Sequence, residues 1–91
     1  MTHRVVGTDE ALSNIDEIYG FIAAFNPSAA RRLADRLLAA GISLSEFPER
    51  GRAVAPGLRE LTLVWPYVLR YSVANKQVIV RRIRHGARQP D

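Results

Sequence analysis

The chain has 91 residues, 47% of them hydrophobic, and a formal net charge of +4 from 13 basic and 9 acidic side chains. This length suits one small domain, and the hydrophobic content excludes a disordered chain. The absence of cysteine excludes disulfide bonds and thiolate metal sites.

The basic side chains are concentrated in the second half of the chain. Residues 1–47 carry four basic and six acidic side chains, a net charge of −2, whereas residues 48–91 carry nine basic and three acidic ones, a net charge of +6. All the basic side chains except Lys76 are arginines, whose planar group binds carboxylates and phosphates. This asymmetry predicts an acidic partner.

Residues 3–7 predict a short first strand, and a helix follows it. Thr8 is a favourable N-cap, and Asp9 and Glu10 lie in the first turn, where the helix dipole stabilises negative charge. Apolar residues then recur at alternating spacings of four and three, which places them on one helix face. These residues are Ala11, Ile15, Ile18, Ile22 and Phe25.

A second helix begins at Asn26-Pro27, because asparagine is a favoured N-cap and proline is tolerated at the first helical position. Apolar residues at three-and-four spacing continue to Phe47, and Pro48 ends the helix. Two helices with so short a connection pack antiparallel. Residues 9–47 therefore predict a helical hairpin.

Residues 48–57 predict a loop, because they contain two prolines and two glycines. Three strand-like runs follow at 58–64, 67–73 and 78–84, and their tight connections predict an antiparallel meander within residues 58–85. Residues 86–91 are left as a short tail. Residues 1–91 thus predict a single α+β domain, with the hairpin on one face of a four-stranded sheet.

Six short motifs occur in a fixed order along the chain. They are Ile15-x-x-Ile18-Tyr19-x-x-Ile22, Asn26-Pro-x-Ala-Ala30, Phe47-Pro-x-x-Gly-Arg52, Leu58-Arg-Glu-Leu61, Tyr67-x-Leu-x-Tyr-x-Val73 and Ile83-Arg-His-Gly-Ala-Arg88. None is specific alone, but their order and spacing over residues 8–90 resemble the toxins of the ParE/RelE superfamily. The resemblance implies a β-α-α-β-β-β fold with an antiparallel sheet, which agrees with the periodicity.

The resemblance also implies a function. Members of this superfamily are toxins of bacterial type II toxin–antitoxin modules, which include plasmid-stabilisation systems. A small antitoxin neutralises each toxin by wrapping its C-terminal segment over it. RelE-like members cleave messenger RNA on the ribosome, whereas ParE-like members are associated with inhibition of DNA gyrase and have no established catalytic chemistry.

Departures from the ribonuclease pattern favour the ParE branch. RelE-like enzymes carry a basic residue after the sheet tyrosine, but here Val68 follows Tyr67. No tyrosine follows Tyr71, and the only lysine, Lys76, lies in a predicted turn. We therefore assign no catalytic residue and favour a toxin that is not an enzyme.

The alternative interpretation, a RelE-like mRNA endoribonuclease, would use His85 with Arg59 and Arg88. His85 would act as general acid near neutral pH, and the two arginines would hold a phosphate. ParE-like members also carry a histidine in this motif, so His85 does not separate the branches. A structural role for His85, ordering the end of the strand, is favoured over catalysis.

The pair Arg59-Glu60 has a structural interpretation too. Adjacent strand residues point to opposite faces, so the two side chains cannot line one site. We expect Glu60 to order an arginine such as Arg82 or Arg84, and Arg59 to contribute to the basic face. The aromatic residues expected in the core are Tyr67, Tyr71 and Trp65.

Two functional surfaces follow from these assignments. The residues assigned to the toxicity or target surface are Arg59, Arg82, Arg84, His85 and Arg88. Those assigned to antitoxin binding are Arg31, Arg32, Arg36 and Arg81, together with the outer face of the helical hairpin and an unpaired edge of the last strand. The sequence does not fix the hairpin register, and which arginines share a face stays open.

The sequence therefore predicts a ParE-like toxin that acts on DNA gyrase and binds a ParD-like antitoxin. A homologue that binds its antitoxin but has lost toxicity remains a third interpretation. We expect no cofactor and no metal, and no direct nucleic-acid binding, because the basic stretch lacks interleaved aromatics. The absence of a signal-peptide core and of an apolar run of about 18 residues predicts a cytoplasmic protein without membrane contacts.

Overall fold

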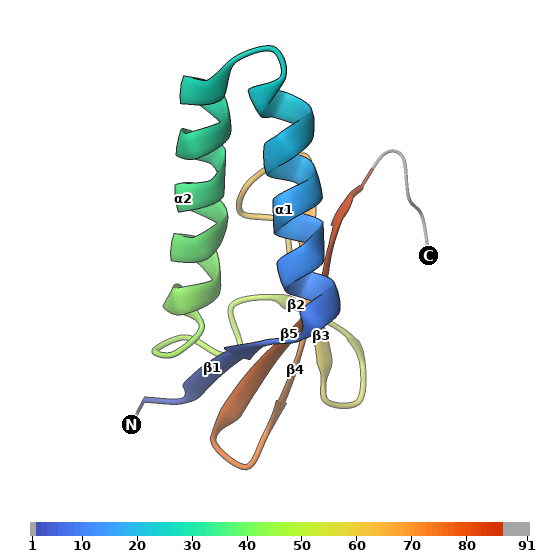
Figure 1. Cartoon of the computed structure of the whole chain (residues 1–91). Coiled ribbons are helices and arrows are strands. Elements are labelled where there is room, and N and C mark those ends of the chain that lie inside the picture. Colours follow the sequence, from blue (N-terminus) through green and yellow to red (C-terminus); the bar gives the residue numbers. More distant parts are fainter. Residues whose placement is uncertain (1, 87–91) are drawn as a thin grey trace.

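The computed structural model describes residues 2–86 and contains a helical hairpin and one sheet (Figure 1). The elements are β1 (Arg4–Gly7), α1 (Asp9–Ala23), α2 (Pro27–Ser43), β2 (Arg52–Ala55), β3 (Leu58–Leu61), β4 (Tyr67–Ala74) and β5 (Gln77–His85). Both predicted helix caps are confirmed. The side-chain oxygens of Thr8 and Asn26 accept hydrogen bonds from the backbone N–H groups of Ala11 and Ala29, at 3.1 and 3.0 Å.

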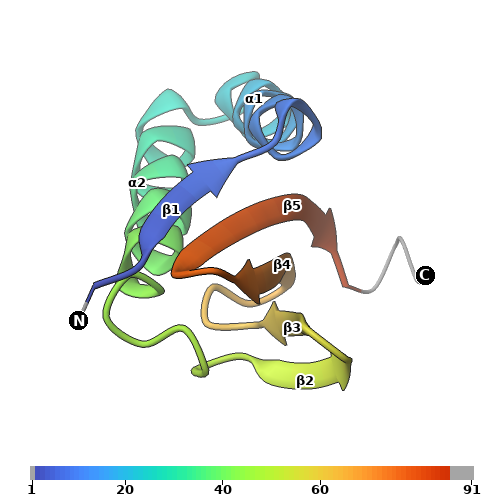
Figure 2. The same cartoon turned by 90° about the horizontal axis from the view of Figure 1, so that it is seen from below.

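The strand order is β1-β5-β4-β3-β2, with the two helices on one side of the sheet (Figure 2). The predicted α+β class and the meander of β3, β4 and β5 are confirmed, and a two-residue turn at Asn75 and Lys76, both with positive φ, joins β4 to β5. Two details differ from the prediction. The sheet has five strands because β2 forms within the predicted loop 48–57, and it is mixed because β1 pairs with β5 in parallel.

The core lies between the helices and the sheet. Its largest fully buried side chains are Tyr71, Leu37, Leu44, Leu69 and Val78. The core position predicted for Trp65 is wrong: this side chain is 74% exposed, because the neighbouring Val64 takes the buried position in the connection from β3 to β4. Phe25 and Phe47 lie beyond the ends of their helices and are also exposed.

The predicted unpaired edge of the last strand is present only in part. β1 pairs with residues 77–80 of β5, and two side chains, from the N-cap and the first half of α1, bond to the backbone beyond that point. The Thr8 hydroxyl donates to the carbonyl of Arg81 at 2.9 Å, and the Ile83 N–H donates to the Asn14 carboxamide oxygen at 2.9 Å. The polar groups that would accept an added strand are therefore partly occupied by side chains.

Tyr71 connects the sheet to the segment that enters β2. Its hydroxyl donates to the Pro48 carbonyl and accepts from the Gly51 N–H, both at 2.8 Å. Gly51 is buried against this hydroxyl, and a Cβ there would lie 2.6 Å from the hydroxyl oxygen and 2.8 Å from the Glu60 carbonyl oxygen. Only glycine can occupy position 51 without a shift of Tyr71 or of the backbone at Glu60.

We predict that Gly51→Ala lowers the free energy of unfolding by about 1–3 kcal/mol, because the added methyl group has no room. The matched control is Gly20→Ala in α1, where a Cβ meets no atom within 4 Å. That change should raise stability by about 0.5–1 kcal/mol through helix propensity. Urea denaturation of the two variants checks the prediction, and equal effects would contradict the packing at Gly51.

Burial raises the pKa of Tyr71 above its ordinary value near 10, against the lowering effects of the Gly51 hydrogen bond and the nearby arginines. The neutral phenol is therefore favoured in the folded state. Its contribution to stability is full below pH 10 and declines as the pH rises further, because the unfolded chain releases the proton first. We expect Tyr71→Phe to remove this component, and denaturation curves recorded on both sides of pH 10 would measure it.

Candidate functional site

A β-bulge determines on which face of the sheet the arginines of the last strand lie. Arg70 pairs with Arg82 and Tyr71 with Val80, so that Arg81 is an extra residue without a partner in β4. Ile83 returns to the core side after the bulge, and Arg82 and Arg84 lie on the face opposite the helices. The Arg81 Nε donates to the Ser72 hydroxyl on that same face at 3.0 Å. The bulge thus places Arg81, Arg82 and Arg84 together on the outer face.

One of them, Arg84, shares a buried carboxylate with two arginines of other strands. Glu60 is 8% exposed, and its Oε2 accepts from the Nη2 and Nε of Arg70 at 2.6 and 3.0 Å. The Arg84 Nη2 lies 3.3 Å from the same oxygen, and the Arg52 Nη2 lies 3.8 Å from Oε1. We call Glu60, Arg52, Arg70 and Arg84 the outer arginine cluster. The expected contact between Glu60 and Arg84 is confirmed.

The outer arginine cluster carries more positive than negative charge. Its four side chains carry three positive charges and one negative charge, and all three guanidinium groups lie within 3.8 Å of the carboxylate oxygens. The Arg52 side chain is 78% exposed and that of Arg70 is 28% exposed, which makes this charge accessible at the surface. An anionic group approaching this face would meet forked donors held in place by Glu60.

Sequence reasoning missed Arg70, the strongest partner of Glu60. The signal was present in the period-two pattern of β4, where Leu69 and Tyr71 belong to the core and Arg70 points the other way. Only the register, with Glu60 opposite Arg70, shows which carboxylate it meets. Arg82 lies across from Arg70 and also reaches Glu10 of α1, with the Arg82 Nε 3.7 Å from Glu10 Oε2.

Arg59 lies apart from this cluster. It pairs with Tyr71 in the register of β3 and β4, which places it on the helix side of the sheet. Its Nη1 donates to the Gly51 and Glu49 carbonyls at 2.7 and 3.3 Å. The side chain therefore fixes the segment before β2, and the structure does not bring it together with Arg82 and Arg84.

His85 lies at the other end of the helix side. Its ring meets that of Tyr67 edge to face, with 5.5 Å between the ring centres. The two rings line a hollow of about 260 Å³ between α1 and the ends of β4 and β5. Tyr67 and Tyr71, the partners of His85 and Arg59, lie four residues apart, which separates the two candidates by about 13 Å along the strands and about 10 Å across them. Arg88 lies outside the described residues.

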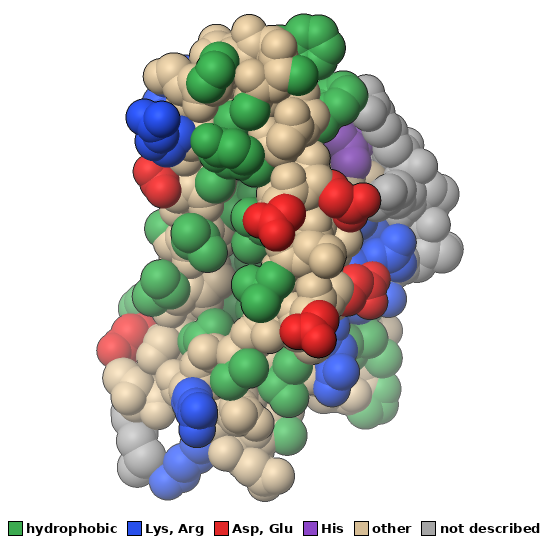
Figure 3. Space-filling view, viewed as in Figure 1, with side chains coloured by type: hydrophobic (Ala, Val, Ile, Leu, Met, Phe, Trp, Pro, Cys, Tyr) green, Lys and Arg blue, Asp and Glu red, His purple; other side chains and the backbone are tan. Residues whose placement is uncertain are grey.

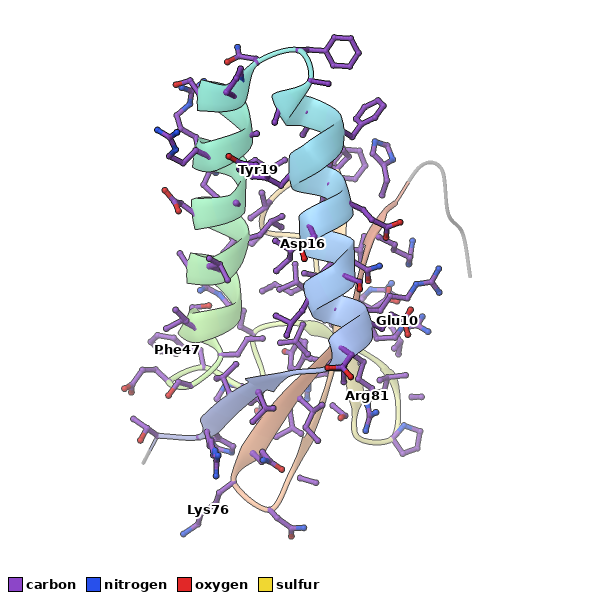
Figure 4. The ribbon with its side chains drawn as sticks, in the orientation of Figure 1. Glu10, Asp16, Tyr19, Phe47, Lys76 and Arg81 are labelled. Atoms are coloured by element: carbon purple, nitrogen blue, oxygen red, sulfur yellow. The ribbon has the colours of Figure 1, made fainter. Side chains whose placement is uncertain are left out.

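The arginines of α2 form a separate group. Arg31 and Arg32 are exposed near the start of α2 and Arg36 just past its middle, and Arg32 donates to the Ser28 hydroxyl at 3.1 Å. Arg81 lies near the start of α1, which is beside the opposite end of α2 in the antiparallel hairpin (Figure 4). The four residues assigned to antitoxin binding therefore do not form one patch.

An apolar stripe runs over the outer side of the hairpin. Figure 3 shows hydrophobic side chains gathered between the two helices, with acidic side chains along α1. Figure 4 shows Tyr19 extending from α1 toward α2. The exposed residues that form this hairpin stripe are Leu12, Tyr19, Leu38 and Ile42. Such a stripe is an apolar contact surface for another chain.

Two further observations concern residues 2–86 only. No group of three or more histidine, aspartate and glutamate side chains in this part is arranged to hold a metal ion. Neither α1 nor α2 is long and apolar enough to span a membrane.

The chain is similar along nearly its whole length to known toxins. Residues 5–90 match the family described as the ParE toxin of the type II toxin–antitoxin system parDE. The chain is 51% identical over 85 residues to Toxin RelE2 of Caulobacter vibrioides, covering 93% of this chain and 97% of that protein. It is 37% identical over 92 residues to Toxin RelE1 of the same organism, covering 98% and 99%.

A solved structure shares the fold. The chromosomal ParDE toxin–antitoxin system from P. aeruginosa contains a chain that superposes with a TM-score of 0.80 at 24% identity. The match covers 92% of this chain and 96% of that one.

We predict that Glu60→Gln lowers the free energy of unfolding by about 2–3 kcal/mol, because it leaves clustered guanidinium groups without their counter-charge. The loss should shrink at high salt, which screens repulsion between the partly exposed arginines. Glu46→Gln, an exposed carboxylate outside the cluster, is the control and should change stability little. Equal effects of the two changes would show that Glu60 does not organise this face.

Proposed function

The chain belongs to the ParE toxin family of type II toxin–antitoxin systems, and we propose that it inhibits growth by binding a protein target, DNA gyrase, in the cytoplasm. The observation that carries this proposal is the separation of the candidate catalytic side chains. Arg59 is bound to the carbonyls of Gly51 and Glu49, and His85 packs on Tyr67 at the far end of the sheet. A ribonuclease needs its proton-transfer groups and its cations around one phosphate. Their separation favours action through a binding surface.

The proposed target surface is the outer face of the sheet. The excess positive charge of the outer arginine cluster, with Arg81 and Arg82 beside it, suits an acidic protein surface. Arg84 is held on this face by Glu60, so its role is to maintain the array of donors. Arg52 and Arg70 supply accessible guanidinium groups.

The proposed partner is a ParD-like antitoxin. The hairpin stripe offers apolar area to an amphipathic segment, and the arginines at the start of α2 offer charge to acidic residues of the same segment. An antitoxin segment that contacts both the hairpin stripe and these arginines would lie along the hairpin.

Two observations support a second candidate function. Relatives at 51% and 37% identity are named RelE toxins, and the outer arginine cluster places one carboxylate among several guanidinium groups. In an mRNA endoribonuclease, Glu60 would take the 2′-hydroxyl proton, and Arg70 and Arg84 would stabilise the phosphorane. In the structure, however, both of these arginines already bind the Glu60 carboxylate that would have to act as base.

The deciding experiment measures DNA supercoiling by purified gyrase on relaxed plasmid, with this protein freed from antitoxin. We expect inhibition or accumulation of cleaved plasmid complexes. The same preparation added to translating ribosomes should leave messenger RNA intact. Cleavage of ribosome-bound messenger RNA without any effect on gyrase would replace the proposal with the ribonuclease function.

The variant His85→Ala tests whether this side chain acts as a general acid. We expect its growth inhibition to stay within about tenfold of the unchanged protein, because loss of a contact is small beside loss of a general acid, which costs about 100-fold or more. Circular dichroism should show that the variant folds. A folded His85→Ala protein without toxicity would identify His85 as a catalytic group.

A further inference from the structure

The connection from β3 to β4 presents apolar side chains that the proposed function leaves unused. Trp65, the only tryptophan of the chain, is 74% exposed, and Leu63 is 51% exposed. Val64, which lies between them in the chain, is 3% exposed and belongs to the core. Tryptophan is well buried in most proteins, and at surfaces it is enriched where another chain binds. This pair is therefore a candidate contact surface.

Hydrogen bonds hold the backbone of this connection in place. The N–H of Tyr67 donates to the carbonyl of Val64, and the N–H of Gly86 donates to the carbonyl of Pro66, both at 2.9 Å. The buried side chain of Val64 is a third attachment. A partner that contacts Trp65 would thus order one side chain on a backbone that is already held, which lowers the entropic cost of binding.

A groove of about 430 Å³ connects Leu63 to the outer arginine cluster. Its lining includes Arg50, Arg52, Glu60, Thr62 and Leu63. Arg50 and Arg52 are exposed, whereas Glu60, the only acid in the described lining, is buried and bonded to Arg70. A ligand in this groove would therefore meet positive charge beside the apolar side chain of Leu63, which favours an anionic ligand.

Trp65 extends this groove with a second apolar side chain. It stands two residues beyond Leu63, so the two Cα atoms lie within about 7 Å of each other. The indole ring and the two exposed arginines are thus within reach of one short segment of another chain. We call Arg50, Arg52, Leu63 and Trp65 the Trp65 surface.

We propose that the Trp65 surface binds an acidic segment of a partner protein that also carries a large apolar side chain. The apolar side chain packs on Leu63 and Trp65, and the neighbouring carboxylates pair with Arg50 and Arg52. A protein segment is favoured over single-stranded nucleic acid, because stacking of bases uses successive aromatic rings and Leu63 offers none. The inference adds an apolar anchor to the proposed target surface, and it rests on the proposed function only in taking a protein as the partner.

The test follows the fluorescence of Trp65, which reports on this surface because the chain has no other tryptophan. The full chain is titrated with the peptide acetyl-DELLED-amide, and the control peptide acetyl-DESSED-amide keeps the charge without the apolar side chains. We expect the first peptide to shift the emission to shorter wavelength in a saturable way, and to bind at least about tenfold more tightly than the control. Equal binding of the two peptides, or no saturable shift, would overturn the proposal. A six-nucleotide oligothymidylate is the third probe, and tighter binding of this probe than of the first peptide would replace the protein partner with a nucleic acid.

Variants locate the interaction, and the anisotropy of the fluorescein-labelled peptide compares them without the Trp65 signal. Trp65→Ala should weaken binding at least about tenfold, and Arg52→Gln about threefold. The control for the ring is Phe25→Ala, an aromatic side chain that is 80% exposed beyond the end of α1. The control for the charge is Arg4→Gln, an exposed arginine of β1, at the opposite edge of the sheet from β2. Both controls should leave binding unchanged, and equal effects of the variants and their controls would refute a site at the Trp65 surface.

The gyrase assay separates this inference from the proposed function. Where the unchanged protein inhibits supercoiling, we expect half inhibition by Trp65→Ala to need at least about tenfold more protein. Equal inhibition by the two proteins would overturn the assignment of Trp65 to the target surface. Peptide binding through Trp65 by a protein that leaves gyrase active would instead support the Trp65 surface and contradict gyrase as the target.

Discussion

The carboxylate of Glu60 is the group on which the outer face of this protein depends. It lies on β3, its main partner Arg70 lies on β4, and Arg84 lies on β5, so one side chain joins the three strands of the meander. Without it, several arginines on neighbouring strands would face one another across spacings of about 5 Å. A nearly buried charge is tolerated here because more than one guanidinium donates to it. The Glu60 carboxylate thus reduces the repulsion among the arginines that share this face.

The bulge at Arg81 gives that charge its arrangement. A regular β5 would place Arg81 and Arg82 on opposite faces, and one of them would face the core. The extra residue lets Val80 and Ile83 both pack on the helix side while Arg81 and Arg82 both reach the outer face. The same irregularity returns His85 to the helix side, beside Tyr67. The bulge at Arg81 therefore places the arginines of this stretch on the outer face and His85 on the helix side.

The sequence predicts most of the fold because its local signals agree with one another. Thr8 and Asn26 mark both helix starts, and the three-and-four spacing identifies the core faces of both helices. What escapes prediction depends on pairing between distant segments. β2 forms in a proline- and glycine-rich stretch because β3 offers it a partner, and Trp65 is exposed because Val64 occupies the core position beside it.

The candidate site was harder to predict for the same reason. Each of its arginines is visible in the sequence, but the grouping of Arg70 with Glu60, and the separation of Arg59 from both, depend on strand register. Charge counts could suggest an acidic partner without showing which face meets it. Only the paired strands distinguish an arginine that supports the backbone from one that is presented at the surface.

Helix α1 separates two surfaces that a partner would have to reach in different ways. At about 100° per residue, the positions of Leu12 and Tyr19 in the hairpin stripe lie about 160° around the helix from those of Asn14 and Phe21 beside the hollow. The buried side of α1, with Ala11 and Ile15, lies between them. A chain seated only on the stripe would leave the hollow and the outer arginine cluster open. Covering both surfaces at once requires a chain that crosses α1 or passes around an end of the hairpin, so neutralisation of this toxin by one antitoxin is best served by an extended segment.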